Sequence, residues 1–105
     1  MLEAAKLART YVSGKSKDDF LRDIQCQDAV VHRLVIIGEA ARRVSEETRS
    51  SLSSLPWTRI IGMRNLIIHR YDAVDLEVVG DTVENNLIPL INAIEPYVPP
   101  RETGS

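Results

Sequence analysis

The segment from Arg64 to Tyr71, RNLIIHRY, carries the side chains of this chain that are best suited to act on a phosphodiester. An imidazole such as that of His69 can take the proton from a ribose 2′-hydroxyl near neutral pH. A guanidinium such as that of Arg64 can hold the non-bridging phosphate oxygens while negative charge builds on the pentacoordinate transition state. Arg64 and His69 are therefore the candidate catalytic pair, and the reaction they predict is RNA cleavage by internal attack.

The spacing of these residues sets a geometric problem. At about 100° per residue, Asn65 and His69 share one face of a helix, whereas Arg64 and His69 are separated by about 140°. The pair could converge if the helix begins irregularly near Gly62, if the long Arg64 side chain bends around, or if a second subunit supplies the partner. One imidazole also cannot comfortably serve as both base and acid in one step, and a second His69 across a two-fold axis would fill that gap.

The acidic residues near this segment do not indicate metal chemistry. A two-metal nuclease needs several convergent carboxylates, and Asp72, Asp75 and Glu77 form no recognisable cluster of that kind. We therefore expect no metal site and no cofactor. The spacing alone is a weak indication of catalysis, so two other classes stay open: a non-catalytic helical module that binds a nucleotide or a partner, and a structural dimerisation protein.

The composition is that of one soluble, globular domain. Of 105 residues, 44% are hydrophobic and 27% are charged, which is ordinary for a folded domain. The formal net charge of −2 counts against strong non-specific binding to nucleic acid, but ten of the thirteen cationic residues are arginines, which suit local phosphate contacts. Because no apolar run approaches the length of a membrane-spanning helix, we expect a cytoplasmic protein that does not bind membranes.

The apolar periodicity predicts an all-α protein, an antiparallel bundle of four or five helices. Ser16 with Asp19 is close to a capping box, Ser54 is a capping candidate for the helix that Pro56 opens, and prolines stop the last helix. The expected helices are residues 2–13, a segment from residue 16, 25–47, a segment from residue 56, and 76–94. Residues 1–98 form the single predicted domain, and residues 99–105 are predicted to be a disordered tail.

The longest predicted helix, residues 25–47, has an apolar face wider than one neighbouring helix would cover. It should therefore be central in the bundle or be shared between the core and an oligomer interface. Gly38, in its middle, is expected to allow a close helix crossing. Gly62 marks a point at which the next helix could kink or break.

Three further residues have an ordinary structural interpretation. Cys26 is expected to be a small packing thiol and not a reactive one, and His32 a partly buried structural histidine. Glu39 is expected to form an exposed ion pair with Arg42 or Arg43 at helical spacing, with a place at the edge of an active cleft as the alternative.

Longer strings of sequence are more specific than the spacing. Residues 36–47 read IIGEAARRVSEE, residues 55–79 read LPWTRIIGMRNLIIHRYDAVDLEVV, and LIPLI follows. Within them Arg64, His69 and Tyr71 fill the pattern Arg, any four residues, His, any one residue, Tyr. With its Gly-Glu-Ala and Pro-Trp context, the chain resembles the HepT-like family of the HEPN superfamily over roughly residues 20–94.

The resemblance implies a ribonuclease toxin of a type VII-like toxin–antitoxin system, encoded beside a minimal nucleotidyltransferase antitoxin. It implies a homodimer in which both copies of the motif line one cleft, with Arg64 and His69 as the catalytic pair and Asn65 as a supporting polar residue. It also implies that the antitoxin transfers AMP to the hydroxyl of Tyr71, since the added phosphate would occupy an RNA-binding cleft with bulk and negative charge. The implied partners are therefore RNA, a second subunit and the antitoxin.

Overall fold

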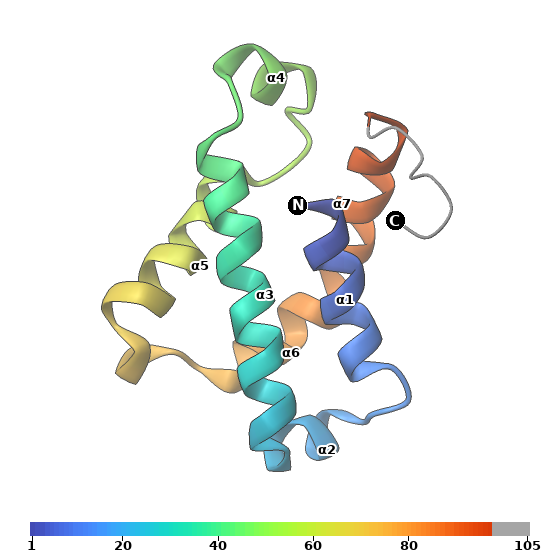
Figure 1. Cartoon of the computed structure of the whole chain (residues 1–105), viewed down its shortest axis with the longest axis vertical. Helices are drawn as coiled ribbons and strands as arrows, with labels where there is room; N and C mark the ends of the chain where they lie inside the picture. Colours follow the sequence, from blue (N-terminus) through green and yellow to red (C-terminus); the bar gives the residue numbers. More distant parts are fainter. Residues whose placement is uncertain (98–105) are drawn as a thin grey trace.

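Helix α3 (Ile24–Arg42) is the element around which the chain is organised. Our computed structural model describes residues 1–97, so the tail expected at 99–105 lies outside the described residues. In Figure 1, α5 lies along one side of α3, and α1 with α7 lies on the other side. Over residues 1–97 all regular structure is helical, which confirms the predicted all-α class.

The elements follow one another with short connections. In chain order they are α1 Leu2–Val12, α2 Lys17–Arg22, α3 Ile24–Arg42, α4 Glu46–Ser51, α5 Trp57–His69, the 3₁₀ turn η1 Tyr71–Ala73, α6 Leu76–Asn85, α7 Leu87–Ile94 and the 3₁₀ turn η2 Glu95–Tyr97. Helices α2 and α4 are short and lie at opposite ends of α3, so the longer helices α1, α3, α5 and the α6–α7 segment form the body (Figure 1).

The buried core runs along α3. Val30, Leu34, Ile37 and Ala41 recur at helical spacing and are all buried. Val30, Leu34 and Ile37 pack into one hydrophobic cluster with buried residues of α1, α6 and α7, including Ala5. Because apolar burial is the main favourable term in folding, α3 is the support on which the side chains of α5 are placed.

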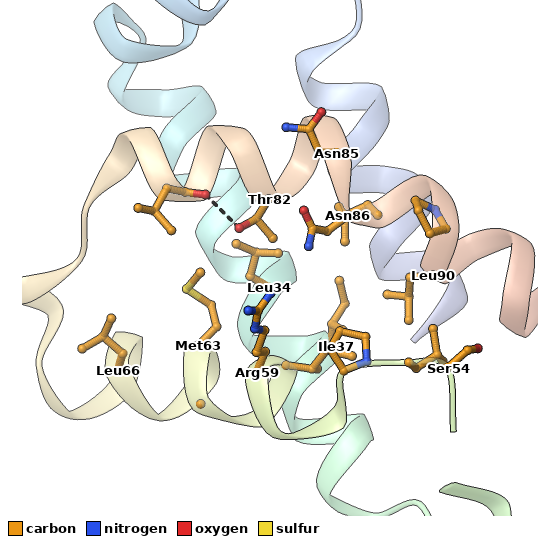
Figure 2. A pocket seen from close by; sticks show the side chains of 17 residues that line it. Leu34, Ile37, Ser54, Arg59, Met63, Leu66, Thr82, Asn85, Asn86 and Leu90 are labelled. Carbon is orange, nitrogen blue, oxygen red and sulfur yellow. Dashed lines mark hydrogen bonds between the residues drawn. The ribbon is translucent and has the colours of Figure 1, made fainter. Parts of the chain in front are cut away.

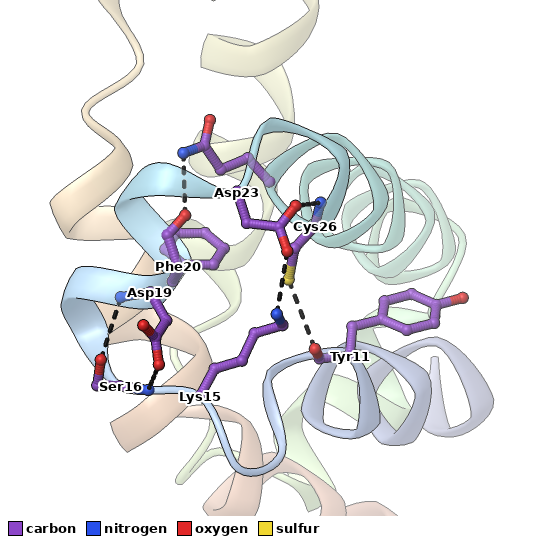
Figure 3. Close-up of polar contacts among 8 residues, drawn as sticks. Tyr11, Lys15, Ser16, Asp19, Phe20, Asp23 and Cys26 are labelled. Atoms are coloured by element: carbon purple, nitrogen blue, oxygen red, sulfur yellow. Dashed lines mark hydrogen bonds and ion pairs between the residues drawn. The ribbon is translucent and has the colours of Figure 1, made fainter.

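The turn between α1 and α3 is fixed by polar contacts (Figure 3). Ser16 and Asp19 form the predicted capping box at the start of α2, with each side chain bonded to the backbone N–H of the other residue. Asp23 then caps α3 by accepting from the Cys26 N–H, and Lys15 donates to the same carboxylate at 3.0 Å. These two contacts lower the pKa of Asp23, so its carboxylate stays ionised to a lower pH than that of an ordinary aspartate.

The same turn explains two buried groups. The Gln27 amide is buried and donates to the Phe20 carbonyl at 2.9 Å, which satisfies a polar group inside the core. The Cys26 thiol is also buried and donates to the Tyr11 carbonyl at 3.5 Å. Cys26 belongs to the buried hydrophobic cluster, so its predicted packing role is confirmed. Burial also raises the pKa of this thiol.

Two predicted helices are shorter than expected. The helix expected over 25–47 ends at Arg42, and Ser45 caps a separate helix α4 through its bond from the Thr48 N–H. The helix expected over 76–94 is divided at Asn86 into α6 and α7. Pro89 explains this division, because it has no N–H to bond back to the preceding turn and its ring clashes there.

Two local expectations are also wrong. His32 is exposed on α3 and is not a partly buried histidine. Ser54 does not cap α5, because its N-cap residue is Pro56 and no side chain caps this end. Within residues 1–97, no helix combines the length and the apolar character needed to cross a membrane.

Phe20 provides a test of the packing of α2 against α6. Its side chain is 3% exposed, and a Cβ added at Gly80 of α6 would lie 3.3 Å from its ring. Phe20→Ala should lower the free energy of unfolding by roughly 3–5 kcal/mol, as measured by urea denaturation. Ile24→Ala is the control: Ile24 is 71% exposed, so its truncation should change stability by less than about 0.5 kcal/mol. Equal losses in the two variants would contradict the packing described here.

Candidate active site

The site begins where α5 crosses α3. Gly38 on α3 faces Arg64 on α5, and a Cβ added to Gly38 would lie 2.8 Å from Arg64 Cγ, closer still to Arg64 Cβ, and 3.3 Å from the Ile60 carbonyl oxygen. No residue other than glycine fits there without displacing Arg64. The predicted close crossing at Gly38 is therefore confirmed, and it brings the backbone of α3 directly against the base of the Arg64 side chain.

Arg64 is held by two neighbours. Its Nε donates to Glu39 Oε1 at 2.8 Å, its Nη2 donates to the same oxygen, and its Nη1 donates to Asn65 Oδ1 at 2.8 Å. Only 14% of its side chain is exposed. A guanidinium bound on two sides has a fixed plane, so the structure gives Arg64 a definite orientation before any ligand arrives.

Glu39 lies between two arginines. Its Oε1 accepts from Arg64, and its Oε2 lies 3.8 Å from Arg42 Nη1. The hydrogen bonds from Arg64, with the charges of Arg64, Arg42 and Arg43, hold the pKa of the Glu39 carboxyl below its usual value. The predicted pair with Arg42 is present, but the shorter contact is with Arg64, which spacing along one helix could not reveal.

His69 stands apart from this cluster. It is the last residue of α5 and is exposed, and its side chain has no hydrogen bond or ion pair with the described residues. Helix α5 is continuous from Trp57 to His69, so no break interrupts it at Gly62. His69 therefore lies about 7.5 Å along the axis from Arg64 and about 140° around it.

Of the three routes by which Arg64 and His69 could converge, two are removed by these contacts. The helix does not begin irregularly near Gly62. The Arg64 side chain does not bend toward His69, because Glu39 binds it on the side of α3. A single chain thus brings together Arg64, Asn65 and Glu39, but it does not bring His69 to them.

Tyr71 lies just beyond α5, on the 3₁₀ turn η1. It is 53% exposed, and its hydroxyl has no hydrogen bond with the residues from 1 to 97. Its sequence neighbours Arg70 and Asp72 form an exposed ion pair with Nε and Oδ1 3.6 Å apart. Tyr71 is therefore an exposed side chain just beyond the end of α5.

A separate groove of about 600 Å³ opens between α5 and the α6–α7 segment (Figure 2). Arg59, Met63 and Leu66 line it from α5, where they follow one another at intervals of four and three residues. Asn86 lines the opposite wall. Its lining is mainly apolar and includes none of the four predicted site residues. Helix α5 thus has one side toward this groove and another that carries Arg64.

The described residues contain no group of three or more His, Cys, Asp or Glu side chains that could hold a metal ion. The acidic residues that follow the motif, Asp72, Asp75 and Glu77, are all exposed. Asp75 accepts from the Glu77 N–H as the N-cap of α6. Its carboxylate therefore serves a structural purpose in this chain.

Comparison with known proteins places the chain in a family. The family model described as "Ribonuclease HepT-like" matches residues 1–97. This match covers the α3–α5 crossing and the Arg64–Tyr71 motif together. The chain belongs to the HepT-like ribonuclease family, as its resemblance to that family implied.

Individual relatives share the same description. The chain is 32% identical over 93 residues to a protein of Thermococcus cleftensis named "Probable ribonuclease HepT", a match covering 89% of this chain and 84% of the relative. It is 39% identical over 72 residues to an RNase-like protein of Caldanaerobacter subterraneus, covering 69% of this chain and 64% of the relative. No solved structure matches the chain.

A longer relative shows that this unit also occurs within a larger protein. A Methanocaldococcus jannaschii protein named "Gamma-glutamylcyclotransferase and putative RNase" is 34% identical over 87 residues. That match covers 83% of this chain but 39% of the relative. The chain thus spans less than two thirds of the length of the Caldanaerobacter and Methanocaldococcus relatives.

The helix crossing generates a matched pair of glycine variants. Gly38→Ala should lower the free energy of unfolding by about 1–3 kcal/mol, because the new methyl group overlaps the stem of Arg64. Gly62→Ala should instead raise it by up to about 1 kcal/mol, because nothing lies within 4 Å of the added Cβ and alanine favours a helix interior. Both values can be measured by chemical denaturation, and a Gly38→Ala protein as stable as Gly62→Ala would show that the crossing is looser than described.

Proposed function

We propose that this chain is a metal-independent RNA endonuclease of the toxin type, with Arg64 and His69 as its catalytic pair and Asn65 as a supporting polar residue. One observation carries the proposal most directly: in a chain of the HepT-like ribonuclease family, the Arg64 guanidinium is already oriented by Glu39 and Asn65. His69, on the same helix, is exposed and unbonded within the described residues.

The reaction is internal attack. The ribose 2′-oxygen forms a bond to phosphorus and the bond to the 5′-oxygen breaks, leaving a 2′,3′-cyclic phosphate and a 5′-hydroxyl. One His69 imidazole takes the proton from the 2′-hydroxyl, and a second one supplies a proton to the departing 5′-oxygen. The guanidinium of Arg64 stabilises the charge on the non-bridging oxygens. The names of the relatives support RNA as the substrate.

A homodimer supplies the second imidazole. Because both routes by which His69 and Arg64 could meet within one chain are removed, the route through a second subunit is the one we adopt. Ile68 and Tyr71 are 44% and 53% exposed near His69 in the sequence, and exposed apolar side chains are suited to a protein interface. A two-fold axis near them would place both copies of the motif in one cleft.

Tyr71 fits the role of a control point. We propose that a minimal nucleotidyltransferase antitoxin of a type VII-like system transfers AMP from ATP to this residue. The Tyr71 oxygen bonds to the α-phosphorus, pyrophosphate departs, and the phenolic proton passes to solvent or to a base of the transferase. The exposure of the hydroxyl supports this role, as does its position two residues beyond His69. Such a protein and its RNA substrate would act in the cytoplasm.

His69 gives the main test of the proposed reaction. The purified protein should cleave RNA in the presence of EDTA and leave cyclic-phosphate ends, and His69→Ala should lower the rate by about 10²–10⁴-fold because the acid–base group is lost. His32→Ala is the matched control, since His32 is exposed on α3 and should not change the rate. Full-rate cleavage by His69→Ala would refute the mechanism.

The same variant tests the dimer. When unfolded wild type and His69→Ala are mixed equally and refolded together, a site that needs both imidazoles should retain about a quarter of the wild-type activity, because only homodimers of wild type would act. Activity near one half would mean that each subunit acts alone. Tight mononucleotide binding without RNA turnover in the wild type would instead favour the non-catalytic binding module.

Tyr71 modification is tested by mass. When the chain is co-expressed with a minimal nucleotidyltransferase, its intact mass should rise by whole increments of AMP, and RNA cleavage should stop because of the added phosphate. Tyr71→Phe should keep the unmodified mass and stay active in the presence of the transferase. Tyr97→Phe is the control and should be modified like wild type, because Tyr97 is also exposed but lies on η2, outside the motif. Equal modification of Tyr71→Phe and wild type would exclude this residue.

A further inference from the structure

Some N–H donors of the Arg64 guanidinium are bonded within the chain and others are left for a ligand. A guanidinium carries five N–H donors, and contacts within residues 1–97 use three of them: Nε and Nη2 donate to Glu39 Oε1, and Nη1 donates to Asn65 Oδ1. An oxygen shared by Nε and Nη2 must lie on the side edge of the guanidinium. The second Nη2 hydrogen therefore points away from Glu39, along the end edge that joins Nη2 to Nη1.

We propose that Glu39 is a positioning residue for RNA cleavage: its carboxylate binds the side edge of the Arg64 guanidinium, so that the end edge, Nη1–Nη2, meets the scissile phosphate. This inference rests on the proposed ribonuclease function and extends it to a residue outside the Arg64–Tyr71 motif. Asn65 completes the arrangement by binding Nη1 from the neighbouring position on α5.

Helix α3 is well suited to this positioning. Glu39 directly follows Gly38, the residue at which the backbone of α3 meets the stem of Arg64. The Glu39 and Arg64 side chains therefore extend from two helices in close contact, and this contact limits how far one side chain can move relative to the other. Their side chains are 36% and 14% exposed, respectively. Small errors in the placement of a catalytic group can cost a large factor in rate. An Arg64 guanidinium held in one orientation should therefore give faster cleavage than one that rotates freely.

The surrounding charge shows why a carboxylate can lie so close to a phosphate site. Glu39 Oε2 is turned to Arg42, while the charge of Arg43 also acts on the Glu39 carboxyl. Three guanidinium groups around one carboxylate leave the cluster positive. An alternative in which Glu39 competes with phosphate for Arg64 predicts the opposite effect of its removal, because neutralising it would then free the guanidinium and raise activity.

The experiment compares two neutral side chains of nearly the same shape. Glu39→Gln keeps an oxygen that can accept from Nε and Nη2, whereas Glu39→Met removes it. The kcat and KM values for a short oligoribonucleotide are measured in EDTA for wild type and both variants. Glu47→Met serves as the control, because Glu47 is an exposed glutamate on α4 and its loss changes the net charge by the same amount. Thermal melts identify variants that fail to fold.

If Glu39 positions Arg64, kcat should fall by about 100-fold in Glu39→Met and by clearly less in Glu39→Gln, while KM stays the same or falls. A merely structural residue would lower kcat, RNA affinity and melting temperature together. Wild-type or higher kcat in Glu39→Met, or equal losses in the Met and Gln variants, would overturn the proposal.

A second measurement does not depend on cleavage. In ¹H–¹⁵N NMR spectra of the wild-type chain, the Nε–H of Arg64 should exchange with water at least about 10-fold more slowly than that of Arg22, which is exposed and has no ion pair among the described residues. Equal exchange rates would refute positioning even where RNA is cleaved. Slow exchange at Arg64 in a protein without ribonuclease activity would instead refute the proposed function and leave the geometry in place.

Discussion

The close contact between α3 and α5 at Gly38 is the constraint on which the rest of the site depends. Interaxial distance between helices is set by the side chains at their crossing, and here glycine reduces one side to backbone. This approach allows Glu39 on one helix to reach Arg64 on the other, although 25 positions separate them in the chain. The core along α3 keeps this helix in place, so the orientation of Arg64 is tied to the main hydrophobic cluster.

The charge distribution resolves an apparent conflict between composition and chemistry. With a formal net charge of −2, the whole chain has no strong attraction for a long polyanion. The arginines around Glu39, however, form a local positive cluster beside the motif. Selective contact with one phosphate is compatible with such a surface, whereas sliding along nucleic acid through general attraction is not favoured.

Much of the local structure could be predicted from the sequence, because each correct inference rested on one or two residues that have a single physical effect. The glycine at position 38 predicted a close crossing, and Ser16 with Asp19 predicted a capping box that the structure contains. Errors arose where two effects compete. The apolar stripe of the last helix continues through Asn86, but Pro89 outweighs it and divides the helix.

The candidate site was predictable only within α5. Arg64, His69 and Tyr71 were selected by their residue types, their order and the longer strings around them. The family model spans the segment that holds them, and their roles stay a prediction. The contact with Glu39 was not predictable, because it joins two helices whose relative placement depends on the whole core. Helix geometry also indicated that Arg64 and His69 would not meet in a straight helix, and the continuous α5 agrees with this.

The division at Asn86 has a consequence for the order of folding. It turns α7 back against α1, where Lys6 of the first helix forms an ion pair with Glu95, 89 positions away, and Arg9 bonds to the Val83 carbonyl of α6. Contacts between such distant parts of a chain form late and slow the acquisition of the native state. During synthesis, the face of α1 that packs against α7 stays uncovered until the ribosome has released residues 87–94, so a nascent chain cannot complete its core before these residues have been translated.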